Sequence, residues 1–409
     1  MKRIQIPWLI LSVMLIAALS IFSQPDQSRI NGCLWDRDTL AMEAENYLGI
    51  TDIITGRFDR YPDLYYLMRL DRVTKEIEAT PSNLELYDDA GVACDRLARC
   101  DEAIEWMTRK RAVLDSLSEP DSEHEYRYLA NLGTFHIHRW LKNGADRENL
   151  RDAETARDLI ARAIELNPDA HFGRERYQLL AIEWILEIEN PETTPVLFSV
   201  LPDFHYSGGW HFEQYMRGQL TDLGYDDAVE GLSGLIRLGN AWESIDVFRA
   251  LQVAFANEQH ATLVYLCMLR IHELIAEGKR SLHPDFPYEM YNEESIGSVG
   301  VVTNHSTLRE QYYPEAREES EQWHDERQSF MLGKLSSGSH PDTDASFWSD
   351  FHESTSPVSL PGDDFMSRFR SQNPYLLGIV VILGTLTLGI TGFIAAVVLL
   401  VKKLRATPA

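Results

Sequence analysis

A loop near the middle of the sequence carries residue types that bind metal ions. Asp203, His205 and His211 lie within nine residues, and two adjacent glycines between the histidines would let the chain fold back on itself. Imidazole nitrogens and carboxylate oxygens are common ligands of zinc. This spacing supports one hypothesis, a metal-dependent hydrolase. The neighbouring Trp210 supports the alternative that the loop only packs against the core.

A second pair of histidines, His136 and His138, lies within a predicted helix. Residues two apart on a helix point to nearly opposite sides, so the two imidazoles cannot bind one ion. We therefore expect His136 in the core and His138 in a groove or at the surface. Adjacent carboxylates such as Asp88-Asp89 suit acid–base chemistry, but in a chain this acidic they indicate a solvated face.

No catalytic or cofactor-binding signature is present in the sequence. It contains no H-E-x-x-H, G-x-S-x-G, P-loop or G-x-G-x-x-G motif. We therefore expect a non-catalytic protein that uses no cofactor.

The chain is acidic and has enough apolar residues for a core. The 409 residues carry a formal net charge of −25, and 44% of them are hydrophobic. Several of the basic residues lie at the two ends (Lys2, Arg3, Lys402, Lys403 and Arg405), so the body between them is more acidic still. Such a body repels nucleic acid and anionic lipid, and it suits basic partners or cations.

The four cysteines give no metal or redox signature. None of them forms a C-x-x-C pair. With four cysteines, one disulfide could form in an oxidising compartment. The residues concerned are Cys33, Cys94, Cys100 and Cys267.

The elements that position these residues are predicted to be helices. Apolar residues recur three and four apart in several stretches, and strand-like alternation is rare. Prolines and glycines between the stretches indicate short turns between antiparallel helices. The predicted helices are Asp63–Ala79, Leu84–Arg96, Asp101–Leu114, Tyr126–Leu141, Asp152–Leu166 and His260–Glu277.

The helices contain a recurring pattern of small and aromatic residues. In the first copy, Tyr87 and the pair Ala90-Gly91 lie on one helix and Ala103 lies on the next. Gly91 and Ala103 would let two helix backbones approach closely, while Tyr87 and Met107 fill the gap beside them. A second copy runs from Leu129 through Gly133 to the string A-I-E-L-N-P at 163–168, with an insertion at 143–152, and a third runs through 228–251.

This pattern resembles the tetratricopeptide repeat, a helix–turn–helix unit of 34 residues. The layout as a whole also resembles uncharacterised bacterial membrane-anchored proteins with such repeats. The resemblance implies an all-α fold, in which helix pairs stack into an α-solenoid over residues 33–284.

The resemblance also implies a binding surface, because a stack of helix pairs displays residues of each first helix on its concave side. The acidic residues among them would favour peptides that carry Lys or Arg. The alternative is that these charges only keep the domain soluble. The implied groove residues are Glu85, Asp88, Val92, Asp95, Arg127, Ala130, Thr134 and His138.

The N-terminus carries a membrane signal. Lys2 and Arg3 precede an uncharged stretch whose most apolar part is 7–22. A basic start followed by such a run is typical of a signal peptide, here predicted over 1–23, and an uncleaved signal anchor is the alternative. Both predictions place the body of the chain outside the cytoplasm.

The C-terminus carries a second membrane signal. Residues 371–401 contain no charge, which exceeds the roughly 20 apolar residues needed to cross a bilayer. We predict a transmembrane helix over 374–401, with the basic tail at 402–409 in the cytoplasm. Small residues three and four apart on this helix favour close packing with a second copy, and hence a homodimer. These residues are Thr385, Gly389, Gly392 and Ala396.

Two polar segments connect the repeat region to the predicted span. Residues 285–335 are expected to form a partly helical extension, with one charged helix around Glu315–Arg327. Residues 336–373 are rich in Ser, Gly, Pro and Asp, which is typical of a flexible juxtamembrane linker. Its aromatic residues, Trp348 among them, would serve as a docking motif or as part of an inert spacer.

Together these features predict a membrane-anchored, extracytoplasmic scaffold that binds a protein or peptide. The expected location is the cell (cytoplasmic) membrane, with no nucleic-acid partner.

Overall fold

The structure is a computed structural model, and helices dominate the part of the chain that it describes. No strand occurs in these residues, so the all-α prediction is confirmed for them. The chain divides into two units after Pro357, and every helix of the described residues belongs to the first unit. The described residues are 49–168, 174–188, 197–198, 223–239, 241–258, 260–297 and 305–361.

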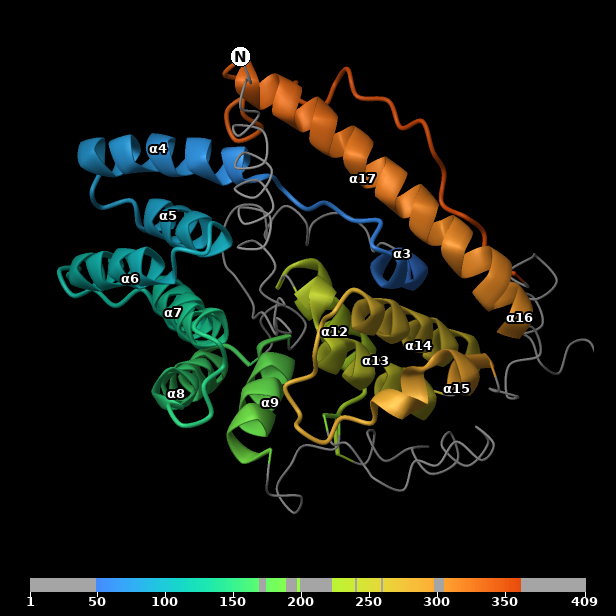
Figure 1. Cartoon of the computed structure of the whole chain (residues 1–409). Coiled ribbons are helices and arrows are strands. Elements are labelled where there is room, and N and C mark those ends of the chain that lie inside the picture. Colours follow the sequence, from blue (N-terminus) through green and yellow to red (C-terminus); the bar gives the residue numbers. More distant parts are fainter. Residues whose placement is uncertain are drawn as a thin grey trace, which may run out of the picture. The chain divides into compact units, whose positions relative to one another are not determined.

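In chain order the described helices are α3 (Ile50–Thr55), α4 (Asp63–Ala79), α5 (Leu84–Arg96), α6 (Cys100–Leu114), α7 (Ser122–Lys142), α8 (Arg151–Leu166), α9 (Arg174–Glu187), α12 (Ala228–Arg237), η2 (Ala241–Glu243), α13 (Ile245–Asn257), α14 (Ala261–Ala276), η3 (Tyr288–Tyr291), α15 (Glu293–Gly297), α16 (His305–Thr307), η4 (Leu308–Tyr312) and α17 (Tyr313–Ser336). Short connections join consecutive helices from α4 to α9 (Figure 1).

The predicted helices agree closely with the observed ones, and α4 and α5 have the predicted bounds. Local chemistry fixes several starts. The Asn83 side chain accepts a hydrogen bond from the backbone N–H of Glu85 at the start of α5, and Asp121 does the same for His124 in α7. The predicted helix around Glu315–Arg327 is longer than expected, because α17 continues to Ser336.

Helices α4 to α9 form a stack in which each packs against the next, and α5 also packs against α7. Gly91 lies at the meeting point of three of them. A Cβ atom at Gly91 would lie 3.0 Å from both the Met107 side chain of α6 and the Phe135 ring of α7. Ala103 is fully buried in the same cluster as Tyr87 and Met107. The close approach expected at Gly91 and Ala103 is therefore present.

Gly133 and Gly231 lie in similarly tight places further along the chain. A Cβ atom at Gly133 would approach two carbons of Ile160 in α8 to 2.9 Å. At Gly231 of α12, a Cβ atom would lie 2.1 Å from the ring of Tyr177 in α9. Both glycines bring a pair of helices closer together than any larger residue would permit.

Helix α13 packs against α12 and α14, and these two helices pack against α3. Trp242 of η2 is at the centre of this contact. Its ring makes an edge contact with Phe58 and lies 3.7 Å from the guanidinium carbon of Arg270. Helix α17, the last of the described helices, packs on the first two, α3 and α4 (Figure 1). Residues on both sides of position 284, the expected end of the repeat region, belong to the same compact unit.

Residues 337–357, which follow α17, form a segment that we call the strap. The composition predicts a flexible linker in this region, but the strap runs back beside α17 (Figure 1) and places Phe347 in a buried cluster, 1% exposed. Composition alone could not show this, because the groups that hold the strap lie near the other end of the sequence. The remainder of the expected linker, from residue 362, lies outside the described residues.

Among the described residues, no helix is long and apolar enough to cross a membrane. The predicted signal segment (1–23) and the predicted span (374–401) lie outside these residues.

Candidate functional site

The residues expected to form an open acidic groove are mostly buried between helices. Asp88, on the face of α5 toward α7, is 2% exposed. Both of its oxygens lie 2.7 Å from the ammonium nitrogen of Lys110 in α6, and Oδ1 also accepts a hydrogen bond from Asn131 of α7 at 3.0 Å. Lys110 is fully buried. Asp88 is thus neutralised inside the protein rather than displayed to a partner.

A second pair joins the same two helices further along them. Nδ1 of His138 in α7 lies 2.7 Å from Oδ2 of Asp95 in α5, and both side chains are buried. An ionised carboxylate only accepts, so this contact places the imidazole proton on Nδ1. In both pairs the partners are 43 positions apart in the sequence, so α5 and α7 are held in a single register.

A third polar pair continues this arrangement from α7 to α9. The Gln178 amide donates to the hydroxyl of Thr134 at 2.9 Å, and both side chains are buried. Val92 and Ala130 are also buried. We call the pairs Asp88–Asn131, Asp95–His138 and Thr134–Gln178 the polar ladder.

Two of the expected groove residues remain accessible. The Glu85 side chain is 64% exposed, while that of Arg127 is 15% exposed and pairs with Glu123 at 2.8 Å. The acidic groove expected from the sequence is therefore not open at Asp88 and Asp95. The reason is that α5, α6 and α7 pack closely enough to bring a lysine and a histidine onto these carboxylates.

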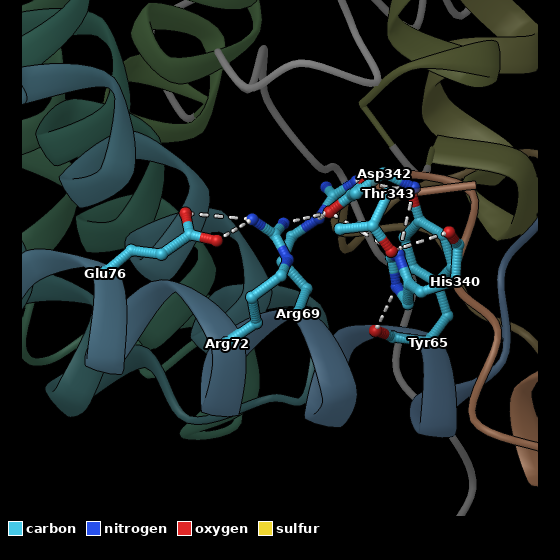
Figure 2. A network of polar contacts seen from close by, with 7 residues as sticks. All are labelled: Tyr65, Arg69, Arg72, Glu76, His340, Asp342 and Thr343. Atoms are coloured by element: carbon cyan, nitrogen blue, oxygen red, sulfur yellow. Dashed lines mark hydrogen bonds and ion pairs between the residues drawn. The ribbon is translucent and has the colours of Figure 1, made fainter. Parts of the chain in front are cut away.

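A larger polar network lies where the strap meets α4 (Figure 2). Asp342 of the strap accepts hydrogen bonds from Arg69 at 2.6 and 2.8 Å and from Arg72. The side chains of Asp342 and Arg69 are 2% and 0% exposed. Arg72 also forms an ion pair with Glu76 at 2.9 Å. Buried, bidentate pairs of this kind are among the strongest polar contacts in proteins.

His340 fixes the start of the strap beside the same helix. Its ring stacks on Tyr65 with centroids 4.5 Å apart, and Nε2 lies 3.0 Å from the backbone oxygen of Tyr65. Nδ1 accepts a hydrogen bond from the N–H of Asp342, which fixes the proton on Nε2. Burial lowers the pKa of His340, with Arg69 and Arg72 acting in the same direction and Asp342 opposing them. The ring is therefore neutral at pH 7.

Aromatic side chains hold the second half of the strap against α17. The ring of Phe347 meets that of Phe330 edge-on, and Trp348 stacks on Phe330 with centroids 5.5 Å apart. The Arg327 guanidinium lies 4.2 Å from the Trp348 ring, where a cation–π contact is favourable. Near the end of the strap, Glu353 pairs with Arg57 at 3.1 Å.

The other predicted site residues are not tested by the structure. Asp203, His205 and His211, the candidate metal ligands, lie outside the described residues, as do Thr385, Gly389, Gly392 and Ala396. Within the described part of the chain, no cluster of three His, Cys, Asp or Glu side chains is arranged to hold a metal ion. His136 is partly buried and pairs with Asp152 at 2.8 Å.

The described cysteines are unsuited to nucleophilic chemistry. Cys94, Cys100 and Cys267 are free and buried. Burial raises the pKa of the Cys94 and Cys100 thiols to about 12, so neither forms a thiolate at neutral pH.

No protein-family model, curated protein or solved structure matches this chain.

The residues that sequence reasoning missed are the charged partners in the buried ion pairs. Lys110, Arg69 and Asp342 each look like ordinary surface charges in the sequence. One local signal was available, since Arg69 lies four residues after Tyr65 and four before Val73, on the buried face of α4. A charged residue at such a position indicates a buried partner elsewhere.

Proposed function

We propose that this protein is a non-catalytic interaction scaffold, built from helix pairs of the tetratricopeptide type and anchored to the cytoplasmic membrane with its body outside. The observation that carries the proposal is the polar ladder. It joins α5 and α7, the first helices of two successive pairs, and continues to α9, in a fixed register. A rigid stack of this kind suits the presentation of a surface to a protein or peptide.

The tight glycine positions support the assignment of repeats. Gly91 and Gly133 each lie on the first helix of a pair where the second helix crosses it, as the resemblance implies. The helix pairs α5–α6 and α7–α8 would be two copies. The uncharged stretch at 374–401 and the basic residues after it support the membrane anchor.

We do not propose that Asp88 and Asp95 bind a basic peptide, as the sequence led us to expect. Asp88 and Asp95 are paired inside the stack and offer no charge to a basic peptide. Contacts of the first helices with a partner would therefore involve exposed positions such as Glu85.

Orientation is tested by protease treatment of intact cells that carry the chain with an epitope tag after residue 409. We expect digestion of the body and protection of the tag. A tag that is lost together with the body would contradict the proposed orientation, and a chain that stays in the soluble fraction would contradict the anchor.

Partner binding is tested with a photo-crosslinking amino acid placed at Glu85 of α5. Glu154 of α8, which is also exposed, is the matched control position. We expect a discrete crosslinked protein from position 85 and none from position 154. Equal, diffuse labelling from both positions would show that the first helices present no specific surface.

A further inference from the structure

We propose that the surface of α4 and α17 beneath the strap is a peptide-recognition site, and that the strap is its resident ligand. This inference rests on the proposed scaffold function and names the partner chemistry: a peptide with an aspartate followed five residues later by an aromatic pair. We call this surface the strap-binding face. It consists of Tyr65, Tyr66, Arg69 and Arg72 of α4 and Phe330, Met331 and Leu335 of α17.

The strap lies on this face as a bound peptide would. It contains no helix or strand of its own, and its hydrogen bonds to α4 and α17 come mainly from side chains. Its anchors are Asp342, between two arginines, and Phe347, 1% exposed in an apolar cluster. The two anchors are joined by consecutive turns, in which the N–H groups of Asp344 and Phe347 donate to the backbone oxygens of His340 and Asp344. Buried aromatic side chains and arginine contacts are typical of binding hot spots.

Contacts within α4 position the two arginines of the strap-binding face. Arg69 is held by a hydrogen bond to the Tyr65 hydroxyl, and Arg72 by its ion pair with Glu76 in the same helix. Two guanidinium groups that converge on one point select a carboxylate. Tyr66, Met331 and Leu335 belong to the apolar cluster that receives Phe347. Both the arginine pair and the apolar cluster would therefore be in place before a peptide binds.

The junction between α17 and the strap permits release. Ser336, Ser337 and Gly338 are exposed, and Gly338 adopts a left-handed conformation at φ 89° that glycine tolerates best. Side-chain contacts along the strap are the main interactions that resist its release. A partner that carries the same chemistry, presented at high local concentration, would compete with it.

The test separates the strap from its face by cutting the chain. A protease-recognition sequence is inserted between Ser337 and Gly338 in the full chain, and a fluorescent peptide of residues 338–357 is the probe. In the uncut chain the tethered strap competes at an effective concentration of about 1 mM, so half-saturation by the probe requires about 1 mM. After cutting and removal of the C-terminal fragment, we expect half-saturation at least about tenfold lower.

Probe variants report the recognised chemistry. We expect D342N and F347A in the probe each to weaken binding about tenfold or more, because each removes one anchor. The S349A probe is the matched control, since Ser349 is exposed, and it should bind like the native sequence.

A second route avoids cutting. The uncut chain carrying D342N and F347A in its own strap should bind the native probe with the lower half-saturation of the cut chain. The proposal is overturned if either altered chain keeps its helical circular dichroism yet binds no probe, or if D342N and F347A probes bind as well as the native one. Unfolding of both altered chains would also overturn it, because the strap would then be part of the core. The assay needs neither membrane nor natural partner, so its failure leaves the crosslinking and orientation tests of the scaffold unaffected.

Discussion

The buried pair between Asp88 and Lys110 allows a quantitative test of how the stack is stabilised. The perturbation is Asp88→Asn, which keeps the shape of the side chain and removes its charge. The two side chains are 3% and 0% exposed, and the ammonium nitrogen lies 2.7 Å from each carboxylate oxygen. The variant leaves a buried ammonium group without its counter-charge.

The expected loss of unfolding free energy follows from the distance between the two charges and from the burial of both side chains. Two unit charges 2.7 Å apart attract each other by about 6 kcal/mol at an effective dielectric constant of about 20. Desolvation of both ions cancels most of this gain, so the intact pair contributes little net stability. Removing one partner leaves the desolvation of the other uncompensated, and we expect Asp88→Asn to cost about 3–5 kcal/mol of unfolding free energy.

The second partner distinguishes this account from a simple loss of packing. Lys110→Met in the Asp88→Asn background removes the stranded charge and keeps the length of the side chain. The double variant should therefore be more stable than Asp88→Asn alone, with a coupling energy of about 2–3 kcal/mol.

The pH dependence of the Asp88→Asn variant is a further readout. Burial lowers the pKa of Lys110 below its ordinary 10.5, and Asp88 opposes this shift. Without Asp88 the folded chain binds fewer protons at Lys110 than the unfolded chain at pH values approaching 10.5. Stability then rises with pH through this window, so the deficit of Asp88→Asn should be smaller at pH 9 than at pH 7.

Equilibrium urea unfolding of the full chain, followed by far-ultraviolet circular dichroism, measures these differences. The matched control is Asp71→Asn, which breaks an ion pair of the same 2.7 Å length between side chains that are 69% and 70% exposed. We expect Asp71→Asn to lower the unfolding free energy by about 0.3–0.5 kcal/mol. A loss of unfolding free energy for Asp88→Asn no larger than that for Asp71→Asn would contradict a buried charge pair at this position. Losses for Asp88→Asn and Lys110→Met that simply add would contradict it too.

Three further predictions concern other parts of the chain. Gly231→Ala should lower the unfolding free energy by about 2–3 kcal/mol, because its Cβ would overlap a buried tyrosine ring, whereas Gly333→Ala, which has open space around it, should raise it by about 0.5–1 kcal/mol. Equal effects of the two in thermal melts would contradict the packing at Gly231. Burial raises the pKa of Asp246 from 3.8 to about 6, so the folded chain holds an extra proton between these values and loses stability as pH rises through them. Asp246→Asn should therefore gain up to about 3 kcal/mol relative to the unaltered chain between pH 4 and pH 7, and a difference that does not change with pH in urea unfolding would show that this carboxyl titrates normally. If the predicted span dimerises through its small residues, replacing Gly389 and Gly392 with Ile should abolish self-association in a membrane reporter assay, and unchanged association would exclude that face.

The helices could be predicted because their signals are local. Apolar residues three and four apart, with Asn83 and Asp121 before the first turns, are enough to give the bounds of α5 and the position of α7. The tight contact at Gly91 was also predictable, because a glycine inside a helical pattern carries a cost that close packing explains.

The partners of the charged residues could not be predicted in this way. Asp88 looks like a surface carboxylate until a neighbouring helix brings Lys110 to it from 22 positions away. The separation is larger for the strap, where Asp342 meets Arg69 across 273 positions. The composition of the strap describes its polar residues and says nothing of the two arginines that bind one of them.

The strap contacts therefore determine where the chain can be truncated without loss of structure. A fragment that ends at Ser336 contains every described helix, and the sequence alone would favour it. It lacks Asp342, which Arg69 and Arg72 share, and Phe347, which fills the cluster between α4 and α17. Charge pairs and apolar contacts within α4 and α17 would remain, so the helices of such a fragment should persist while the strap-binding face becomes open. For that reason, the strap can act both as a structural tie in the intact chain and as the ligand that a competing peptide replaces.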